Sequence, residues 1–125
     1  MALLHEAITE RIIACAIRVH RALGPGLLES VYEVCLAHEL AKEGLRFARQ
    51  VDVPVRYDAV LLDAGFRIDL LVEDAVVVEL KAVEKVQPIH EAQLLTYLRL
   101  SGKSVGLLLN FNELRLRDGL IRRVL

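Results

Sequence analysis

Two kinds of feature are scarce or missing in this sequence: cysteines and long apolar segments. Its two cysteines, Cys15 and Cys35, are too few for a disulfide framework or a four-ligand zinc site, so we expect free thiols. No apolar run reaches the roughly 18 residues that span a bilayer. The opening MALLHEA lacks the basic start and apolar core of a secretory signal. We therefore expect a cytoplasmic protein with no membrane partner.

The chain also lacks an excess of charge of either sign. Its 16 basic and 17 acidic residues give a net charge of −1. A protein that coats nucleic acid without sequence preference is usually clearly basic. The near-neutral balance weakens a nucleic-acid interpretation without excluding it. Acidic residues gathered at a metal site would lower the count while the rest of a binding face stayed positive.

The sequence does contain enough apolar residues for a globular core. Of its 125 residues, 54% are hydrophobic and 26% are charged, which is typical of a folded chain. No repeat, low-complexity tract or linker divides it, so we expect one domain over residues 1–125. The mean hydropathy of +0.40 is high for a small domain. This value favours a homo-oligomer that buries apolar surface between its subunits.

Hydrophobic periodicity predicts alternating helices and strands. Helices are expected at 5–23, 28–43 and 89–101. The second helix should carry its apolar stripe at Leu28, Val31, Cys35, Leu36 and Leu40. Strands are expected at 47–57, 66–72, 76–82 and 105–110, and 60–63 fits either a short strand or a turn. A last hairpin is predicted within 114–124, around Asp118-Gly119. This order indicates an α/β fold, a central mixed β-sheet flanked by helices.

Pro54 interrupts the first predicted strand. Proline cannot donate a ladder hydrogen bond, so it is found at edge strands or bulges. We therefore expect the strand at 47–57 to lie at an edge or to contain a bulge.

Three charged residues stand in the otherwise apolar hairpin RIDLLVEDAVVVELKAV: Asp69, Glu79 and Lys81. Residues two apart on a strand share a face, so Glu79 and Lys81 point the same way. A two-residue loop at 73–74 would turn Asp69 away from Glu79. A three-residue loop at 73–75 would place the two carboxylates opposite each other, with Cβ atoms about 4.5–5.5 Å apart. The strand pattern leaves both loops open, but a metal site formed by both acids requires an odd loop or a bulge, and we predict one.

Two carboxylates that face each other repel unless a positive charge lies between them. Hard oxygen ligands suit Mg²⁺ or Mn²⁺, and Lys81 beside them would hold a water or stabilise charge on a phosphate. This combination suits metal-assisted hydrolysis of phosphodiesters. The alternative is a solvated hairpin face on which Arg67 and Lys81 neutralise the acids. Apolar residues on both faces of these strands argue against it, because they indicate a central strand pair.

Further polar residues fit either interpretation. Gln93 and Tyr97 are four apart on one face of the third predicted helix, and His90 lies on the same stripe. They would line a site or simply form a polar helix face. Glu29, in the first turn of the second helix, would complement the helix dipole or supply a third carboxylate.

These motifs together resemble a known family. The segment Gly26-Leu27-Leu28-Glu29-Ser30-Val31-Tyr32 resembles the GxxExxY signature that names a family of small bacterial proteins. Asp69, Glu79-Leu80-Lys81, Gln93 and Tyr97 are similar to the motifs of the PD-(D/E)xK nuclease superfamily, and most similar to its RecB-like branch. The proline that usually precedes the first Asp is Ile68 here.

The resemblance implies a restriction-endonuclease-like core and a set of roles. Asp69, Glu79 and the main-chain carbonyl of Leu80 would bind Mg²⁺ or Mn²⁺, and Glu29 would complete the site. Lys81 would position or activate the attacking water. Gln93 and Tyr97 would support Lys81 and contact the nucleic-acid substrate, which we expect to be DNA. His20 is a further candidate to approach the site.

Two functions follow as hypotheses. The first is a metal-dependent nuclease or related phosphodiesterase, in which Asp69, Glu79 and Lys81 are catalytic. The second is a non-catalytic binding or assembly protein that retains the nuclease fold. The intact acidic and lysine positions favour the first, while the small size and high apolar content favour the second.

Overall fold

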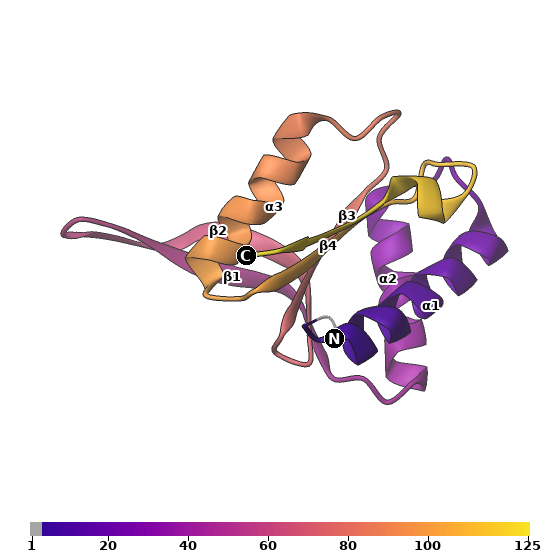
Figure 1. The fold of residues 1–125 in the computed structure, drawn as a ribbon, viewed down its shortest axis with the longest axis horizontal. Coiled ribbons are helices and arrows are strands. Elements are labelled where there is room, and N and C mark those ends of the chain that lie inside the picture. The colour runs from indigo at the N-terminus through magenta and orange to yellow at the C-terminus, as the bar shows by residue number, and fades with distance from the viewer. Residues whose placement is uncertain (1–3) are drawn as a thin grey trace.

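The computed structural model describes residues 4–125. Five strands form one mixed sheet in the order β1-β2-β3-β4-β5, with helices on both faces (Figure 1). The helices are α1 (Glu6–Leu23), α2 (Glu29–Lys42) and α3 (Pro88–Ser101). The strands are β1 (Phe47–Tyr57), β2 (Val60–Val72), β3 (Val76–Lys81), β4 (Val105–Asn110) and β5 (Leu120–Val124), with a short 3₁₀ helix, η1 (Leu116–Gly119), before β5. The predicted α/β architecture is confirmed.

The central strands β3 and β4 run parallel, and the remaining neighbours pair antiparallel. The connection from β3 to β4 passes through α3, as a parallel pair requires a crossover. Every residue of β4 is buried, as predicted for a strand covered on both faces. Among the described residues, no helix is long and apolar enough to cross a membrane.

Two apolar cores lie on opposite faces of the sheet. The larger one joins α1 and α2 to alternate residues of β3 and β4, such as Val76, Val78 and Leu80. The smaller one joins α3 to the intervening residues, such as Val77 and Leu108. Because strand side chains alternate between faces, Glu79 and Lys81 must project into the layer that contains α3.

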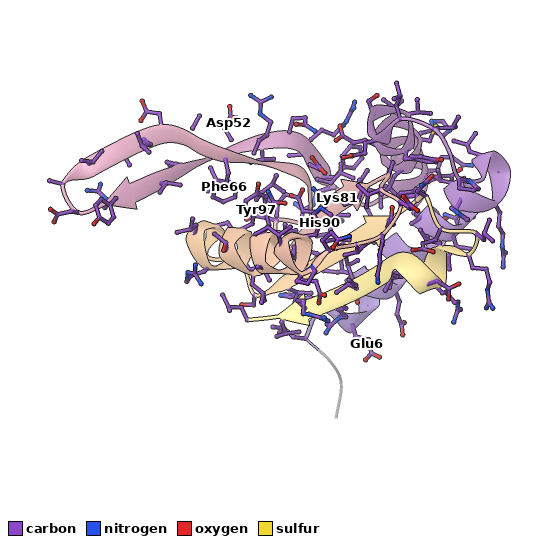
Figure 2. The ribbon with its side chains drawn as sticks, turned by 90° about the horizontal axis from the view of Figure 1, so that it is seen from above. Glu6, Asp52, Phe66, Lys81, His90 and Tyr97 are labelled. Atoms are coloured by element: carbon purple, nitrogen blue, oxygen red, sulfur yellow. The ribbon has the colours of Figure 1, made fainter. Side chains whose placement is uncertain are left out.

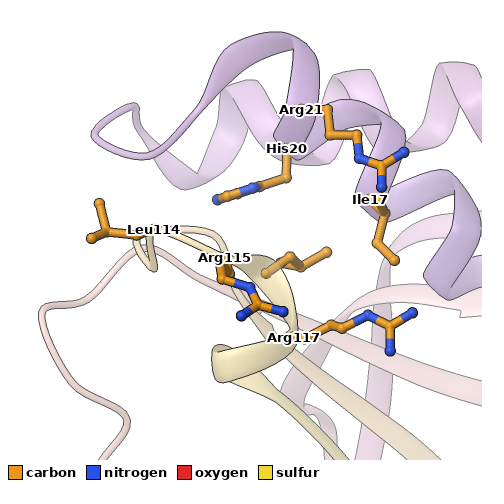
Figure 3. A pocket seen from close by; sticks show the side chains of 7 residues that line it. Ile17, His20, Arg21, Leu114, Arg115 and Arg117 are labelled. Atoms are coloured by element: carbon orange, nitrogen blue, oxygen red, sulfur yellow. The ribbon is translucent and has the colours of Figure 1, made fainter.

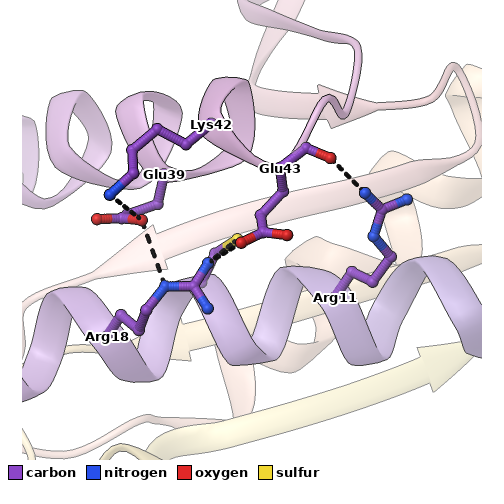
Figure 4. Close-up of polar contacts among 6 residues, drawn as sticks. Arg11, Arg18, Glu39, Lys42 and Glu43 are labelled. Atoms are coloured by element: carbon purple, nitrogen blue, oxygen red, sulfur yellow. Dashed lines mark hydrogen bonds and ion pairs between the residues drawn. The ribbon is translucent and has the colours of Figure 1, made fainter.

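Charged contacts fasten α1 to α2 along their exposed edge (Figure 4). The Arg18 guanidinium lies between two carboxylates of α2 and its end, at 3.3 Å from Glu39 and 2.9 Å from Glu43. Lys42 adds a contact to Glu39, and Arg11 donates to the main-chain carbonyl of Glu43. Solvent-exposed pairs of this kind contribute little each, so the buried apolar core remains the main link between these helices.

The hairpin of β1 and β2 extends beyond the rest of the domain (Figure 1). Its outer residues, 56–65, are all exposed. β1 is an edge strand, and its register shifts between Val53 and Val55, on either side of Pro54. Both expectations for Pro54 are thus confirmed, and residues 60–63, left open between strand and turn, belong to β2. We call residues 55–65 the arm.

Two expectations drawn from local pattern are wrong. The segment 114–124 is not a hairpin: the Asp118-Gly119 turn lies in η1, and β5 pairs with β4 instead. The predicted apolar stripe of α2 is confirmed at Leu36 and Leu40 but is wrong at Leu28 and Val31, which are 74% and 37% exposed. The face that α2 buries is formed by Tyr32, Glu33, Leu36, Ala37 and Leu40.

Candidate active site

The turn between β2 and β3 sets the register of the acidic residues. Glu73 and Asp74 have φ of 53° and 51°, and the Ala75 N–H donates to the Val72 carbonyl at 3.0 Å. The ladder pairs Val72 with Val76, so the loop has three residues. That register places Asp69 opposite Glu79, as the three-residue alternative predicts.

The β2 strand changes face at Asp69. Ile68 packs in the α3 core, whereas Leu70, two residues on, packs in the α1–α2 core. Residues two apart on a regular strand would share a face. Gln50, across from Asp69 on β1, has a φ of 51°, so both strands are irregular at this point. The irregularity lets the Asp69 side chain turn toward the end of β3.

Asp69 and Glu79 contact each other directly. The Asp69 N–H donates to Oε1 of Glu79 at 3.3 Å, and the Leu80 N–H donates to Oδ2 of Asp69 at 2.9 Å. The side chains thus replace the regular ladder, whose last pair is Leu70 with Val78. Two carboxylates from neighbouring strands are held together at the position where the strands separate.

Burial of Glu79 changes its acid–base chemistry. The residue is only 5% exposed. Burial, followed by the negative charge of Asp69, raises the pKa of Glu79 to about 9, against the smaller opposing effects of the Asp69 N–H and of Lys81. At neutral pH and without a cation, Glu79 therefore holds a proton. A positive ion between the carboxylates would lower the pKa of Glu79, so that the carboxyl group releases its proton.

Lys81 and α3 form the other wall of the site (Figure 2). The Lys81 ammonium lies 3.5 Å from Oε1 of Gln93. Tyr97, one turn further along α3, stacks on Phe66 of β2 with ring centroids 4.2 Å apart. The Tyr97 hydroxyl lies within electrostatic reach of both acids. Its pKa is raised by burial and then by the charges of Glu79 and Asp69.

Glu29 lies at the first position of α2 and lines a hollow of about 390 Å³ together with Asp69 and Leu80. Tyr32 explains part of the sequence motif around it. Its hydroxyl donates to the Gly24 carbonyl at 2.6 Å and accepts from the Leu27 N–H at 3.0 Å. These bonds fix the turn that delivers Glu29 to the hollow. The Glu29 carboxylate has no ion-pair or hydrogen-bond partner within residues 4–125.

Glu33 and Gln50 belong to the site but were not predicted. The Glu33 carboxylate accepts from the Arg49 guanidinium at 2.9 Å and from the Gln50 amide at 2.5 Å. The same amide nitrogen lies 3.5 Å from Oδ1 of Asp69. Gln50 therefore links a buried, charge-paired glutamate to the candidate ligand. The four-residue spacing of Glu29 and Glu33 was the only signal in the sequence.

Asn110 was also missed, and it fixes the backbone beyond Lys81. It is fully buried beside Lys81 on the parallel ladder. Its side chain accepts from the Val83 N–H at 3.1 Å and donates to the Val83 carbonyl at 2.9 Å. Both bonds hold the segment that leaves β3, so the Lys81 main chain is anchored on either side.

The two histidines considered from the sequence each make a structural contact. His90 Nδ1 accepts from the Gln87 N–H at 2.9 Å, which caps the start of α3. His20 is buried, with Nε2 at 2.7 Å from the Glu113 carbonyl, and it lines a different hollow. The structure therefore does not bring His20 to the acidic pair.

The donor set fits a hard divalent cation. Asp69 and Glu79 supply adjacent carboxylate oxygens, and the pair holds a proton when no cation is bound. Within residues 4–125, no group of three or more His, Cys, Asp or Glu side chains is close enough to hold a metal ion. Glu29 shares the hollow with Asp69 without joining a three-carboxylate cluster. The candidate side-chain ligands that already contact each other are thus the two acids.

The comparison with protein families agrees with this geometry. The family model of the PD-(D/E)XK nuclease superfamily matches residues 6–124, nearly the whole chain. The chain belongs to that superfamily, and its fold is restriction-endonuclease-like. Nucleases of this superfamily generally use divalent metal ions. No significant match was found among curated proteins or among solved structures.

Proposed function

We propose that this protein is a Mg²⁺- or Mn²⁺-dependent nuclease that hydrolyses phosphodiester bonds, with DNA as the expected substrate. The observation that carries the proposal is the contact between Asp69 and the buried Glu79, with Lys81 on the same face of the same strand. A structural salt bridge would pair these acids with cations. Here the two acids face each other, an arrangement that favours cation binding.

Each residue of the site has a proposed role. Asp69, Glu79 and the main-chain carbonyl of Leu80 would hold the cation, and the unpaired Glu29 would move in to complete its ligands. The bound cation would polarise the scissile phosphate and acidify a coordinated water. Lys81, held near Gln93, would orient the attacking water and stabilise charge on the phosphate oxygens.

Gln93 and Tyr97 would contact the nucleic-acid backbone from α3. Both lie on the helix face that approaches the acids, and the Tyr97 ring is fixed by its stacking on Phe66. A fixed aromatic ring with a polar end is suited to packing against a sugar or base while its hydroxyl contacts a phosphate oxygen.

Within the superfamily we propose the GxxExxY family and the RecB-like branch. The support is the position of Glu29 at the start of a helix that precedes β1, and the use of Tyr32 to hold the motif's own turn. The unpaired thiols of Cys15 and Cys35 are compatible with the reducing cytoplasm, which we propose as its location.

We also propose a homo-oligomer. Large apolar side chains are exposed along the arm: Tyr57 is 78%, Val60 54%, Leu61 51% and Leu62 54% exposed. Exposed apolar patches of this kind mark interaction surfaces. An assembly role without turnover, the second hypothesis from the sequence, draws its support from this same feature.

Cleavage assays test the nuclease proposal most simply. Purified protein would be incubated with single-stranded, double-stranded and branched DNA, and with RNA, in Mg²⁺, Mn²⁺ or EDTA. We expect metal-dependent cleavage of a DNA substrate that Asp69→Asn abolishes. A preparation that binds Mg²⁺ or Mn²⁺ but cleaves none of these substrates would favour the assembly hypothesis.

A further inference from the structure

A second hollow, of about 220 Å³, lies between the last turns of α1 and the segment that follows β4 (Figure 3). Arg21 lines it from α1, and Arg115 and Arg117 line it from the segment on the other side. The rest of its wall is formed by His20 and by three apolar side chains, Ile17, Leu114 and Leu116. The hollow therefore combines three positive charges with an apolar surface.

The three guanidinium groups have no ion-pair or hydrogen-bond partner within residues 4–125. By contrast, five other arginines each contact a carboxylate: Arg18, Arg46, Arg49, Arg67 and Arg123. No carboxylate lines the hollow; Glu10 lines an adjoining groove that shares Ile17 and Arg117 with it. A positively charged lining without a counter-charge attracts anions.

The arginine positions are fixed by buried neighbours. Leu116 is 4% exposed and packs in the larger core, so Arg115 and Arg117 emerge on either side of an anchored residue. His20 ties the same segment to α1: because a carbonyl can only accept, Nε2 carries the proton and donates to the Glu113 carbonyl at 2.7 Å. The backbone of the hollow is thus held before any ligand arrives.

The hollow opens at the same end of the sheet as the acidic site. β3 and β4 are parallel, so their carboxyl ends meet at one edge. Asn110 lies beside Lys81 there, and the Phe111 N–H donates to the Lys81 carbonyl at 2.9 Å. The segment that carries Arg115 and Arg117 begins a few residues later. Both places therefore lie at one edge of the sheet, with Glu79 and Lys81 on its α3 side and the hollow on its α1 side.

We propose that this hollow binds a backbone phosphate of the nucleic-acid substrate, separate from the phosphate that is cleaved. Guanidinium groups present paired N–H donors that match phosphate oxygens, and charge-assisted contacts of this kind are among the strongest hydrogen bonds in proteins. The apolar wall suits an adjoining sugar. The inference rests on the proposed function only for the choice of nucleic acid as the ligand.

Binding measured without metal tests this inference apart from catalysis. Fluorescence anisotropy of labelled single- and double-stranded DNA oligonucleotides would be recorded in EDTA over a range of salt concentrations. We compare the parent with Arg115→Gln/Arg117→Gln and with a charge-matched control, Arg56→Gln/Arg99→Gln, whose arginines are exposed and unpaired elsewhere. The double variant Arg115→Gln/Arg117→Gln, called the pocket variant below, should bind DNA about tenfold more weakly than the parent, with a shallower salt dependence. The control should change much less.

Three further measurements test the same inference. Arg21→Gln, on the opposite wall, should weaken binding in the same direction, and it serves as the test if the double variant does not fold. Oligonucleotides with and without a 5′-phosphate distinguish a backbone phosphate from a terminal one. If the hollow binds a backbone phosphate, the pocket variant should lose affinity equally for both oligonucleotides. If it binds a terminal phosphate, the variant should lose affinity only for the phosphorylated oligonucleotide. The second pattern would overturn the backbone assignment. Inorganic phosphate should compete with DNA for the parent but not for the pocket variant.

Equal loss in the pocket variant and the control would show a general charge effect and would overturn the inference. So would a parent that binds no DNA. Failure of the proposed function gives a different pattern: DNA binding that depends on Arg115 and Arg117, with no cleavage in Mg²⁺ or Mn²⁺. Cleavage by the parent together with unchanged DNA binding by the pocket variant would overturn the inference and leave the proposed function standing.

Discussion

The Leu80 main-chain N–H donates to Oδ2 of Asp69 at 2.9 Å, across the point where β2 and β3 separate. Leu80 directly follows Glu79, whose Oε1 accepts in turn from the Asp69 N–H. Each acid is therefore oriented by the other acid's strand. The arrangement interrupts the regular ladder beyond the Leu70–Val78 pair and leaves Glu79 buried against a second carboxylate, so it disfavours the ionised state of Glu79 until a cation binds.

Glu79 should make the metal-free protein less stable as pH rises. Its pKa is raised from 4.5 to about 9 in the folded state, so between these values the folded chain holds a proton that the unfolded chain releases. The stability that depends on this proton is complete below the unfolded pKa and is lost as pH rises through the folded one. Urea denaturation in EDTA across this range should show a steeper decline for the parent than for Glu79→Gln.

Parallel stability curves for the two proteins would contradict the raised pKa. Added Mg²⁺ or Mn²⁺ should restore stability to the parent at alkaline pH, since cation binding requires the ionised carboxylate. The same cations should have little effect on Glu79→Gln.

Gln50 should influence cation binding although it is not a proposed ligand. Gln50→Gly removes the amide that links Glu33 to Asp69, and glycine adopts the positive φ of this position without strain. We expect metal affinity to fall by about 10- to 100-fold, as for other residues that orient a ligand. Asp58→Gly, at an exposed position with a φ of 53°, is the matched control. Metal affinity is measured by calorimetric titration of both variants. Parental affinity in Gln50→Gly as well as in the control would show that the contact has no such role.

Gly65 should be required for the shape of the arm. A Cβ at this position would lie 2.1 Å from Cγ2 of Val55 on the paired strand. Gly65→Ala should therefore destabilise the paired arm by about 1–3 kcal/mol, the usual effect of overpacking. Hydrogen exchange should become faster at arm amides while β3 and β4 keep their protection. Unchanged exchange in the arm would mean that Val55 moves aside at no cost.

The exposed apolar side chains of the arm should support self-association. Sedimentation velocity at tens of micromolar, about the weak end of specific association, should give a dimer or larger species. Tyr57→Ser/Leu62→Ser should shift the distribution toward monomer because it removes apolar surface that the domain itself does not bury. A parent that sediments as a monomer at this concentration would refute the assembly proposal.

Local patterns in the sequence predicted much of the fold. The three helices, β1 and β4 were predicted closely because periodicity, glycines and prolines are local signals. Because side chains alternate along a strand, the number of loop residues decides whether Asp69 shares a face with Glu79. The sequence left two alternatives, a two-residue and a three-residue loop. The choice between them depends on backbone torsions at Glu73 and Asp74, which are positive here without glycine. No rule based on residue type would have selected the three-residue loop.

The parts that escaped prediction depend on contacts between distant segments. β5 pairs with β4 rather than with the residues just before the Asp118-Gly119 turn, so this turn dipeptide was misleading. Gln50 reaches Asp69 because both strands are irregular at the same point, and periodicity assumes regular strands. The exposure of Leu28 follows from how the turn before α2 is held, which single-helix patterns do not describe.

The most direct test of the central claim separates cation binding from chemistry at Lys81. Metal titration and turnover would be measured side by side on the folded parent, Asp69→Asn and Lys81→Ala. Asp69→Asn should lose Mg²⁺ or Mn²⁺ affinity, because it removes a charged oxygen ligand. Lys81→Ala keeps both carboxylates and removes a competing positive charge, so it should bind the cation as tightly as the parent or slightly more tightly. Its cleavage rate should nevertheless fall by roughly 10²- to 10³-fold, the scale of one lost charge-stabilising group. If Lys81→Ala cleaves as fast as the parent, Lys81 is a structural charge and the catalytic assignment is wrong.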